Sequence, residues 1–214
     1  MLGLMIKDVY TMKKQMKMTL VISLFYIIFS IADNNIGFLS FVVMFANLGV
    51  LLSTFSYDEK SHWDKYARIL PISYQKIVFS RYAEILIVNA VVFVILMPIM
   101  FFIKKPEQEI LEVLTILIAV ICVSIILLSI MFPIVYKLGM EKARIMIFVI
   151  IFIPVCAAIT IGKLNVGLNM ASFLESPIAN FIGYHLYIIC PLIAAVFFTL
   201  SYQISKSIIA KKEY

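Results

Sequence analysis

The amino-acid sequence predicts an all-α, polytopic membrane protein. Of its 214 residues, 64% are apolar and only 14% are charged, and the mean hydropathy is +1.07. Soluble domains average about 45–50% apolar and about 25% charged residues. The apolar residues fall into six runs, each near the roughly 20 residues with which a helix crosses a bilayer. These observations exclude an ordinary water-soluble domain and predict a single transmembrane domain over residues 1–214.

The first seventeen residues predict an amphipathic helix lying in the membrane interface. Its apolar side chains recur at the helical spacings of three and four and form one stripe: Leu2, Met5, Ile6, Val9, Met12 and Met16. Lys7, Lys14 and Lys17 lie off this stripe, so we expect them to face lipid headgroups. A cleaved signal peptide is the alternative, but no small-residue cleavage site follows Ala32.

Six membrane spans follow this helix. They are predicted at residues 18–32, 38–57, 82–103, 110–136, 145–161 and 178–205. A long hydrophilic segment at 58–81 and a short charged turn at 137–144 join spans on one side. The outer segment at 162–177 is semi-polar. We find no internal repeat.

The basic residues indicate how these spans are oriented. Fifteen of the 18 lysines and arginines lie in the segments 1–17, 58–81, 137–144 and 206–212. The opposite side holds only Lys104, Lys105 and Lys163. Because cytoplasmic segments carry the excess of positive charge, both termini are predicted to be cytoplasmic. The net charge of +6 therefore indicates orientation and not binding to nucleic acid.

The segment 58–81 predicts a short amphipathic helix in the cytoplasm. Ser61 with Asp64 forms a variant of the capping box. An apolar stripe follows at helical spacing, and Pro71 ends the helix; the stripe is Trp63, Tyr66, Ala67 and Leu70. Two interpretations stay open for its aromatic side chains. They could lie in the headgroup belt, or they could dock into a groove on a cytoplasmic protein.

The sequence of this segment resembles that of a known family. The run from Asp58 through Tyr66, the turn Leu70-Pro71-Ile72-Ser73 and the basic entry from Lys76 to Tyr82 are similar to the first cytoplasmic loop of type-2 ABC exporter permeases of Gram-positive bacteria. The turn from Tyr136 to Arg144 is also similar. Within that family the closest resemblance is to the small permeases of phenol-soluble-modulin exporters.

This resemblance implies a specific assembly in the bacterial cell membrane. Two permease subunits, as a homodimer or a heterodimer, would each contact an ATPase on a separate chain that binds ATP and Mg. The coupling helix would correspond to about 62–70, with a second contact at 139–144. The implied ATPase-coupling residues are Asp58, Glu59, Lys60, Trp63, Tyr66, Arg68, Leu70, Pro71, Gly139, Glu141, Lys142 and Arg144. The family's outer segment often forms re-entrant helices, which makes 162–177 a candidate.

Three polar residues inside the predicted spans are candidates for function by default. Asn47 and Asn89 lie within the second and third spans, where they could form interhelical hydrogen bonds or line a pathway. Glu84 lies three residues after Arg81 on one helix face, which favours a local ion pair near the interface.

The sequence also lacks the motifs of several enzymes. It contains no G-x-x-x-x-G-K-[ST] phosphate loop, no His-Glu-x-x-His motif and no Gly-x-Ser-x-Gly elbow. Cys122, Cys156 and Cys190 each lie in an apolar run and predict no disulfide framework. We therefore expect a non-enzymatic permease that binds no cofactor or metal itself and exports amphipathic peptides or other amphipathic cargo. The alternative is a membrane adaptor or immunity protein that transports nothing.

Overall fold

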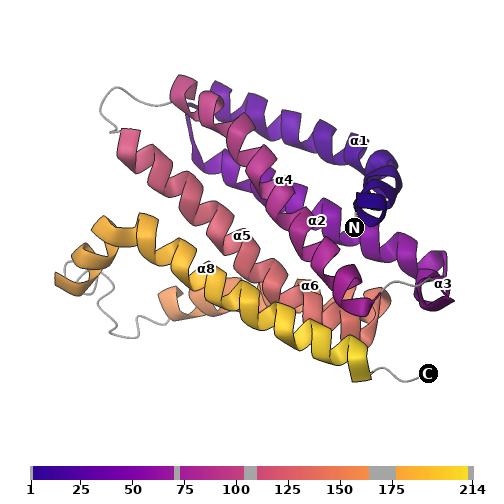
Figure 1. Ribbon diagram of the computed structural model, residues 1–214. Helices are drawn as coiled ribbons and strands as arrows, with labels where there is room; N and C mark the ends of the chain where they lie inside the picture. Colours follow the sequence, from indigo (N-terminus) through magenta and orange to yellow (C-terminus); the bar gives the residue numbers. More distant parts are fainter. Residues whose placement is uncertain (1, 70–72, 104–109, 164–176, 212–214) are drawn as a thin grey trace.

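The computed structural model describes residues 2–69, 73–103, 110–163 and 177–211, and these residues are almost entirely helical (Figure 1). The helices are α1 (Leu2–Ala32), α2 (Gly37–Lys60), α3 (Trp63–Ile69), α4 (Tyr74–Ile103), α5 (Ile110–Leu138), α6 (Met140–Lys163) and α8 (Pro177–Lys211). No strand occurs in the described ranges. The all-α prediction is therefore confirmed, as expected where hydrocarbon forces every backbone polar group to bond within its own helix.

Several helices are long and apolar enough to cross a membrane. Over the described residues these are α2, α4, α5 and the part of α8 from His185 to Lys211. The bent helix α1 makes a fifth if its two halves count as one span. The sequence predicted six spans. The one predicted at 145–161 lies in α6, which is not among the candidate spans found in the described residues, so it stays a prediction. Of the predicted outer segment 162–177, residues 164–176 lie outside the described part of the chain.

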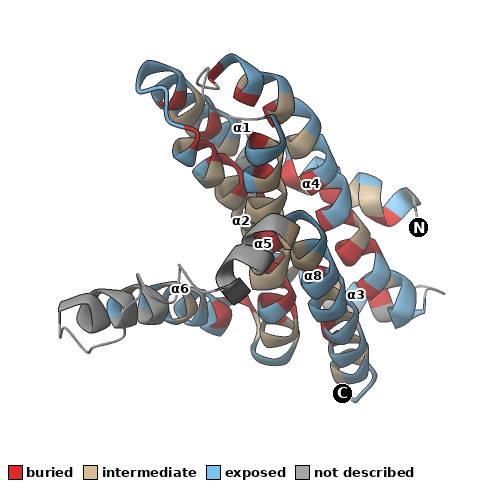
Figure 2. Cartoon of the chain, turned by 90° about the vertical axis from the view of Figure 1, so that its left-hand side faces the viewer, coloured by how far each residue is buried: buried red, intermediate tan, exposed pale blue. Residues whose placement is uncertain are grey.

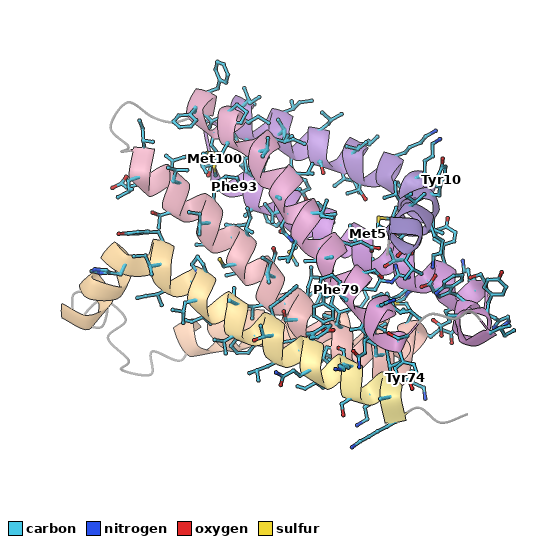
Figure 3. All side chains as sticks on the ribbon, in the orientation of Figure 1. Met5, Tyr10, Tyr74, Phe79, Phe93 and Met100 are labelled. Carbon is cyan, nitrogen blue, oxygen red and sulfur yellow. The ribbon has the colours of Figure 1, made fainter. Side chains whose placement is uncertain are left out.

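Helix α1 has two halves, Gly3–Lys13 and Lys17–Ala32, which meet at an angle of 69°. The first half, which we call the N-terminal segment, buries Leu4, Asp8 and Met12, and leaves Ile6 and Val9 exposed. Of the predicted apolar stripe, Met12 is thus buried against the protein while Ile6 and Val9 are exposed, and the placement of this helix in the membrane interface stays a prediction. Figure 3 shows Tyr10 on the outer side of this segment and Met5 nearer the neighbouring helices. The face that contains Asp8 is the buried one, because a buried carboxylate needs a cation nearby.

The helices pack around two apolar clusters. One, at the far end from α3, includes Leu39, Val43 and Leu96. The other, at the α3 end, includes Phe55, Tyr82 and Phe132. Figure 2 shows the buried residues concentrated where α2, α4 and α5 meet, with α8 largely exposed. The most extensive contacts join α5 to α8 and α1 to α2.

Close packing of α1 on α2 depends on a glycine. A Cβ atom added at Gly49 would lie 2.7 Å from Oγ1 of Thr19 and 3.4 Å from its methyl carbon. Small residues at such crossings let membrane helices approach closely. At the far end, the turn between the two helices is held by Ser30, whose hydroxyl donates to the Asn35 carbonyl at 2.7 Å.

The N-terminal half of α1 and the C-terminal end of α8 lie at the same end of the bundle as α3 (Figure 1). Helix α2 continues past Tyr57 to Lys60, and α4 begins at Tyr74, well before the predicted start of the third span. Much of the hydrophilic segment 58–81 is therefore helical, and it forms the α3 end together with the turn between α5 and α6.

Candidate functional site

Helix α3 is a two-turn helix that begins after a left-handed residue. His62 has φ +50° and Trp63 is the first helical residue. Ser61 caps the C-terminus of α2, where its N–H donates to the Tyr57 carbonyl at 2.9 Å. The predicted role of Ser61 as the N-cap of the amphipathic helix was therefore wrong, because α2 extends one turn further than the apolar run that marks its span.

The aromatic residues of α3 differ in exposure, although the ring centroids of Trp63 and Tyr66 lie only 5.7 Å apart. Trp63 is half-buried, and Nζ of Lys7 lies 3.9 Å from the centroid of its ring. Tyr66 and Ile69, three residues apart, are 56% and 82% exposed. The outward apolar surface of α3 in the described residues is therefore formed by Tyr66 and Ile69, while Trp63 packs against the N-terminal segment.

A buried ion cluster lies behind α3. Asp58 at the end of α2 accepts from Lys7 Nζ at 2.6 Å and pairs with Nη2 of Arg81 on α4. Arg81, only 4% exposed, also contacts Oδ1 of Asp8 at 2.9 Å and Oε2 of Glu84 at 3.6 Å. We call these five residues, Lys7, Asp8, Asp58, Arg81 and Glu84, the charge cluster. The predicted ion pair between Arg81 and Glu84 is confirmed, but it is only one contact of a larger group.

Two members of this cluster, Lys7 and Asp8, were not predicted from the sequence. Lys7 was expected to face lipid headgroups, and this was wrong, because it turns inward to Asp8 and Asp58. Asp8 drew no attention, although it is the single acidic residue among the first seventeen. Its spacing of four residues from both Leu4 and Met12 was the available signal that it shares their buried face.

The charge cluster contains three carboxyl side chains, of Asp8, Asp58 and Glu84, around the two cations of Lys7 and Arg81. Oδ1 of Asp8 is buried and forms ion pairs with Lys7 at 3.1 Å and with Arg81 at 2.9 Å, whereas Oε1 of Glu84 is buried without a hydrogen-bond partner among the described residues. Because an unpaired buried charge costs several kcal/mol (about 3–5 when a partner is removed), the contacts around Arg81 must dominate the stability of this region.

The two segments expected to contact an ATPase are joined to each other. The Glu59 carboxylate accepts from the Met140 N–H at 3.1 Å and so caps the first turn of α6. Gly139, with φ +80°, makes the turn between α5 and α6. Arg144 donates from Nη2 to Oγ of Ser56 at 2.8 Å, a partner that the sequence did not suggest. The end of α2 and the start of α6 therefore form one polar unit.

The remaining predicted coupling residues are distributed on the surface. Lys60, Glu141 and Lys142 are exposed. The Arg68 side chain, Leu70 and Pro71 lie outside the described parts of the chain. Asp58, by contrast, turns into the charge cluster.

Asn47 and Asn89 exchange hydrogen bonds at the centre of the bundle. Each donates from Nδ2 to the other's Oδ1, at 3.0 and 2.9 Å, and Ser124 of α5 lies 3.1 Å from Asn47 Nδ2. Both amides also donate to backbone carbonyls of their own helices, of Val43 and Ile85. This group links α2, α4 and α5 and borders a small pocket lined by Met44, Leu127, Met131 and Ile150.

Metal or disulfide chemistry has no counterpart in the described residues. They contain no group of three His, Cys, Asp or Glu side chains that could hold a metal ion. Cys122 is buried, Cys156 exposed and Cys190 half-buried, and no disulfide joins these cysteines.

These features define a polytopic α-helical membrane protein with a buried ion cluster at the α3 end and a hydrogen-bonded polar group between α2, α4 and α5. The family model of the ABC-2 family transporter proteins matches residues 3–210, nearly the whole chain. The chain therefore belongs to this family and is a permease subunit of an ABC transporter, a class that works in a membrane with an ABC ATPase. No curated protein and no solved structure matches the chain.

Proposed function

We propose that this chain is the membrane subunit of an ATP-driven exporter for amphipathic peptides or other amphipathic cargo, of the type found in small Gram-positive permeases. The α3 end faces the cytoplasm, because the segments that carry fifteen of the 18 basic residues meet there or lead to it. The ATPase binds ATP and Mg on its own chain. This subunit supplies the path and receives the movement.

The observation that carries this proposal is the joining of α3, α2, α4 and α6 at one end. Asp58 pairs with Arg81 of α4, and the next residue, Glu59, caps α6. A push on α3 therefore reaches two long helices through α2, by the buried ion pair of Asp58 with Arg81 and the part-buried hydrogen bond of Glu59 with Met140. Charge-assisted contacts of this kind are among the stronger polar interactions in proteins. Movement as packed bodies is the usual form of such transitions.

The ATPase docks on the outward face of α3. Tyr66 and Ile69 form an exposed apolar pair on a helix with charged neighbours, and this pattern suits a helix that inserts into a groove. The exposed residues Glu141 and Lys142 at the start of α6 lie at the same end of the bundle and form a second contact. Such charges set orientation more than affinity.

The cargo path lies between two copies of the chain. The pocket beside Asn47 holds about 380 Å³ of empty space, part of it open to solvent. A helical peptide is about 10 Å across and does not fit there. An amphipathic peptide reaches a path between subunits directly from the membrane.

Reconstitution with the ATPase tests this function. The co-purified complex in proteoliposomes should move a labelled amphipathic helical peptide when ATP is added. Tyr66→Glu with Ile69→Glu should abolish co-purification of the ATPase, since two charges then enter an apolar groove. Gln75→Glu, which adds a charge at an exposed residue in the first turn of α4, is the matched control and should have no effect.

Two outcomes contradict the proposal. An intact complex that hydrolyses ATP and moves no solute favours the membrane adaptor or immunity protein. Unchanged ATPase binding in the double variant places Tyr66 in the headgroup belt and removes the docking role of α3.

A further inference from the structure

The N-terminal segment, Gly3–Lys13, touches α2, α3 and α4 at the α3 end through two adjacent side chains. Lys7 contacts the Trp63 ring and Asp58, and Asp8 contacts Arg81. We propose that Lys7 and Asp8 are positioning residues for coupling: they hold α3 to α4 so that movement of α3 is transmitted, and not absorbed, at the α3 end. This inference rests on the proposed function and adds the N-terminal segment to the coupling unit.

Helix α3 needs support from outside itself. A helix of seven residues is far below the roughly 12–15 residues at which isolated helices become even marginally stable. Among the described helices, its backbone packs against α2 alone. The left-handed residue His62 connects the two helices.

Lys7 supplies this support to α3. Its side chain is 23% exposed, so water is available to it, yet its ammonium lies 3.9 Å from the Trp63 ring centroid and 2.6 Å from Asp58 Oδ1. The buried indole Nε1 has no hydrogen-bond partner among the described residues. The indole is therefore held through its face, by a cation–π contact worth more where water is excluded.

The N-terminal segment is itself fixed to α4. Asp8 and Arg81 are 2% and 4% exposed and lie 2.9 Å apart. Breaking a buried pair leaves an uncompensated charge, so this contact resists separation. A continuous chain of contacts thus runs from α3 to α4 through Trp63, Lys7, Asp8 and Arg81. The 69° bend that follows Lys13 lets the segment cross the α3 end without carrying the rest of α1 with it.

The single tryptophan of the chain makes this arrangement directly measurable. Lys7→Met keeps the length of the side chain and removes its charge. Acrylamide quenching of Trp63 fluorescence should rise in this variant, because the ring loses its cover. Lys7→Arg should retain the parental quenching, since a guanidinium also stacks on aromatic rings. Lys13→Met, which removes an exposed lysine from the same segment, should change nothing.

The functional readout is the number of peptides moved per ATP hydrolysed in proteoliposomes. In Lys7→Met the ATPase should still co-purify, because Tyr66 and Ile69 are untouched, while this ratio should fall by roughly fivefold, the factor expected from one partly desolvated cation–π contact. A purely structural role would reduce the folding yield, and the correctly folded protein would still move the parental number of peptides per ATP hydrolysed. Trp63→Leu, which leaves the charge cluster complete, should lower the ratio to a similar extent and serves if Lys7→Met folds poorly.

The outcomes separate the two proposals. If the parental complex moves no peptide with ATP, the exporter function itself fails, and the quenching comparison still tests the contact of Lys7 with Trp63. If the parental complex transports and either Lys7→Met or Trp63→Leu keeps the parental ratio, the positioning role is overturned. Unchanged quenching in Lys7→Met also overturns it.

Discussion

Glu59 and Met140 are 81 positions apart in the chain, and the carboxylate of the first accepts a hydrogen bond from the backbone N–H of the second at 3.1 Å. The first N–H groups of a helix have no intrahelical acceptor, and a carboxylate at this position also meets the positive end of the helix dipole. Two segments that are separate loops in the sequence are therefore one structural unit at the α3 end.

Glu59→Ala should weaken this unit. The loss of an N-terminal cap costs about 1 kcal/mol, in a range of roughly 0.5–2 kcal/mol, and should appear as a lower midpoint of thermal unfolding in detergent. Glu59→Gln keeps an acceptor oxygen and should lose less. Glu112→Ala, which removes an exposed acidic residue from the first turn of α5, is the control. A larger loss in Glu112→Ala than in Glu59→Ala would argue against the capping role.

Gly139→Ala should also destabilise the turn between α5 and α6. Gly139 has φ +80°, where a Cβ atom costs roughly 1–2 kcal/mol. The added Cβ would also lie 3.3 Å from Oε1 of Glu59, so the cap has to shift. Gly139→Asn should be milder, because asparagine tolerates this backbone conformation better than alanine. Equal unfolding midpoints for Gly139→Ala and the parent would contradict this account.

Arg81→Gln and Glu84→Gln should differ sharply in their effect on stability. Removing Arg81 leaves Asp8 and Asp58 buried with Lys7 as their remaining cation, and breaking such pairs costs about 3–5 kcal/mol. Glu84→Gln replaces the carboxyl group by an amide of the same size and leaves Arg81 paired with Asp8 and Asp58. Because the Glu84 contact with Arg81 is the longest of the cluster, at 3.6 Å, we expect a loss below about 1 kcal/mol.

Equilibrium unfolding in mixed detergent micelles measures both changes. The matched pair differs only in which sign of charge is removed from one face of α4. If Glu84→Gln is as damaging as Arg81→Gln, Arg81 is not the residue on which the charge cluster depends.

The exchange of hydrogen bonds between Asn47 and Asn89 should appear as a coupling energy. In a double-mutant cycle with Asn47→Ala and Asn89→Ala, we expect about 0.5–2 kcal/mol of interaction, as for other interhelical hydrogen bonds in membranes. Asn47→Ala combined with Ser205→Ala serves as the control, since Ser205 shares a hydrogen bond with Tyr82 and not with the asparagine pair. A coupling energy near zero for the asparagine pair would favour a role in lining the pathway.

Much of the fold was predictable from local patterns. The apolar runs marked α2, α4, α5 and the last part of α8, because the length and composition of a membrane span are properties of one segment. Their ends were less predictable. Helix α2 continues to Lys60 and α4 starts at Tyr74, since a helix can extend beyond the membrane while its hydropathy falls.

The candidate site was predictable only in part. Glu84 and Arg81 were paired correctly because both lie on one helix face. The inward turn of Trp63 was not predicted, and neither was the contact of Arg144 with Ser56, because each depends on a partner from a distant segment.

Composition and charge placement were sufficient to predict a polytopic helical membrane protein, and the residues of the first hydrophilic segment pointed to the ABC permeases. The tertiary structure was needed to place Lys7 and Asp8 at the centre of the α3 end. A lysine and an aspartate on an amphipathic helix are equally compatible with headgroups and with a buried cluster. Which applies depends on the cations and carboxylates that packing brings within about 3 Å, and those lie 50 and more residues away in the chain.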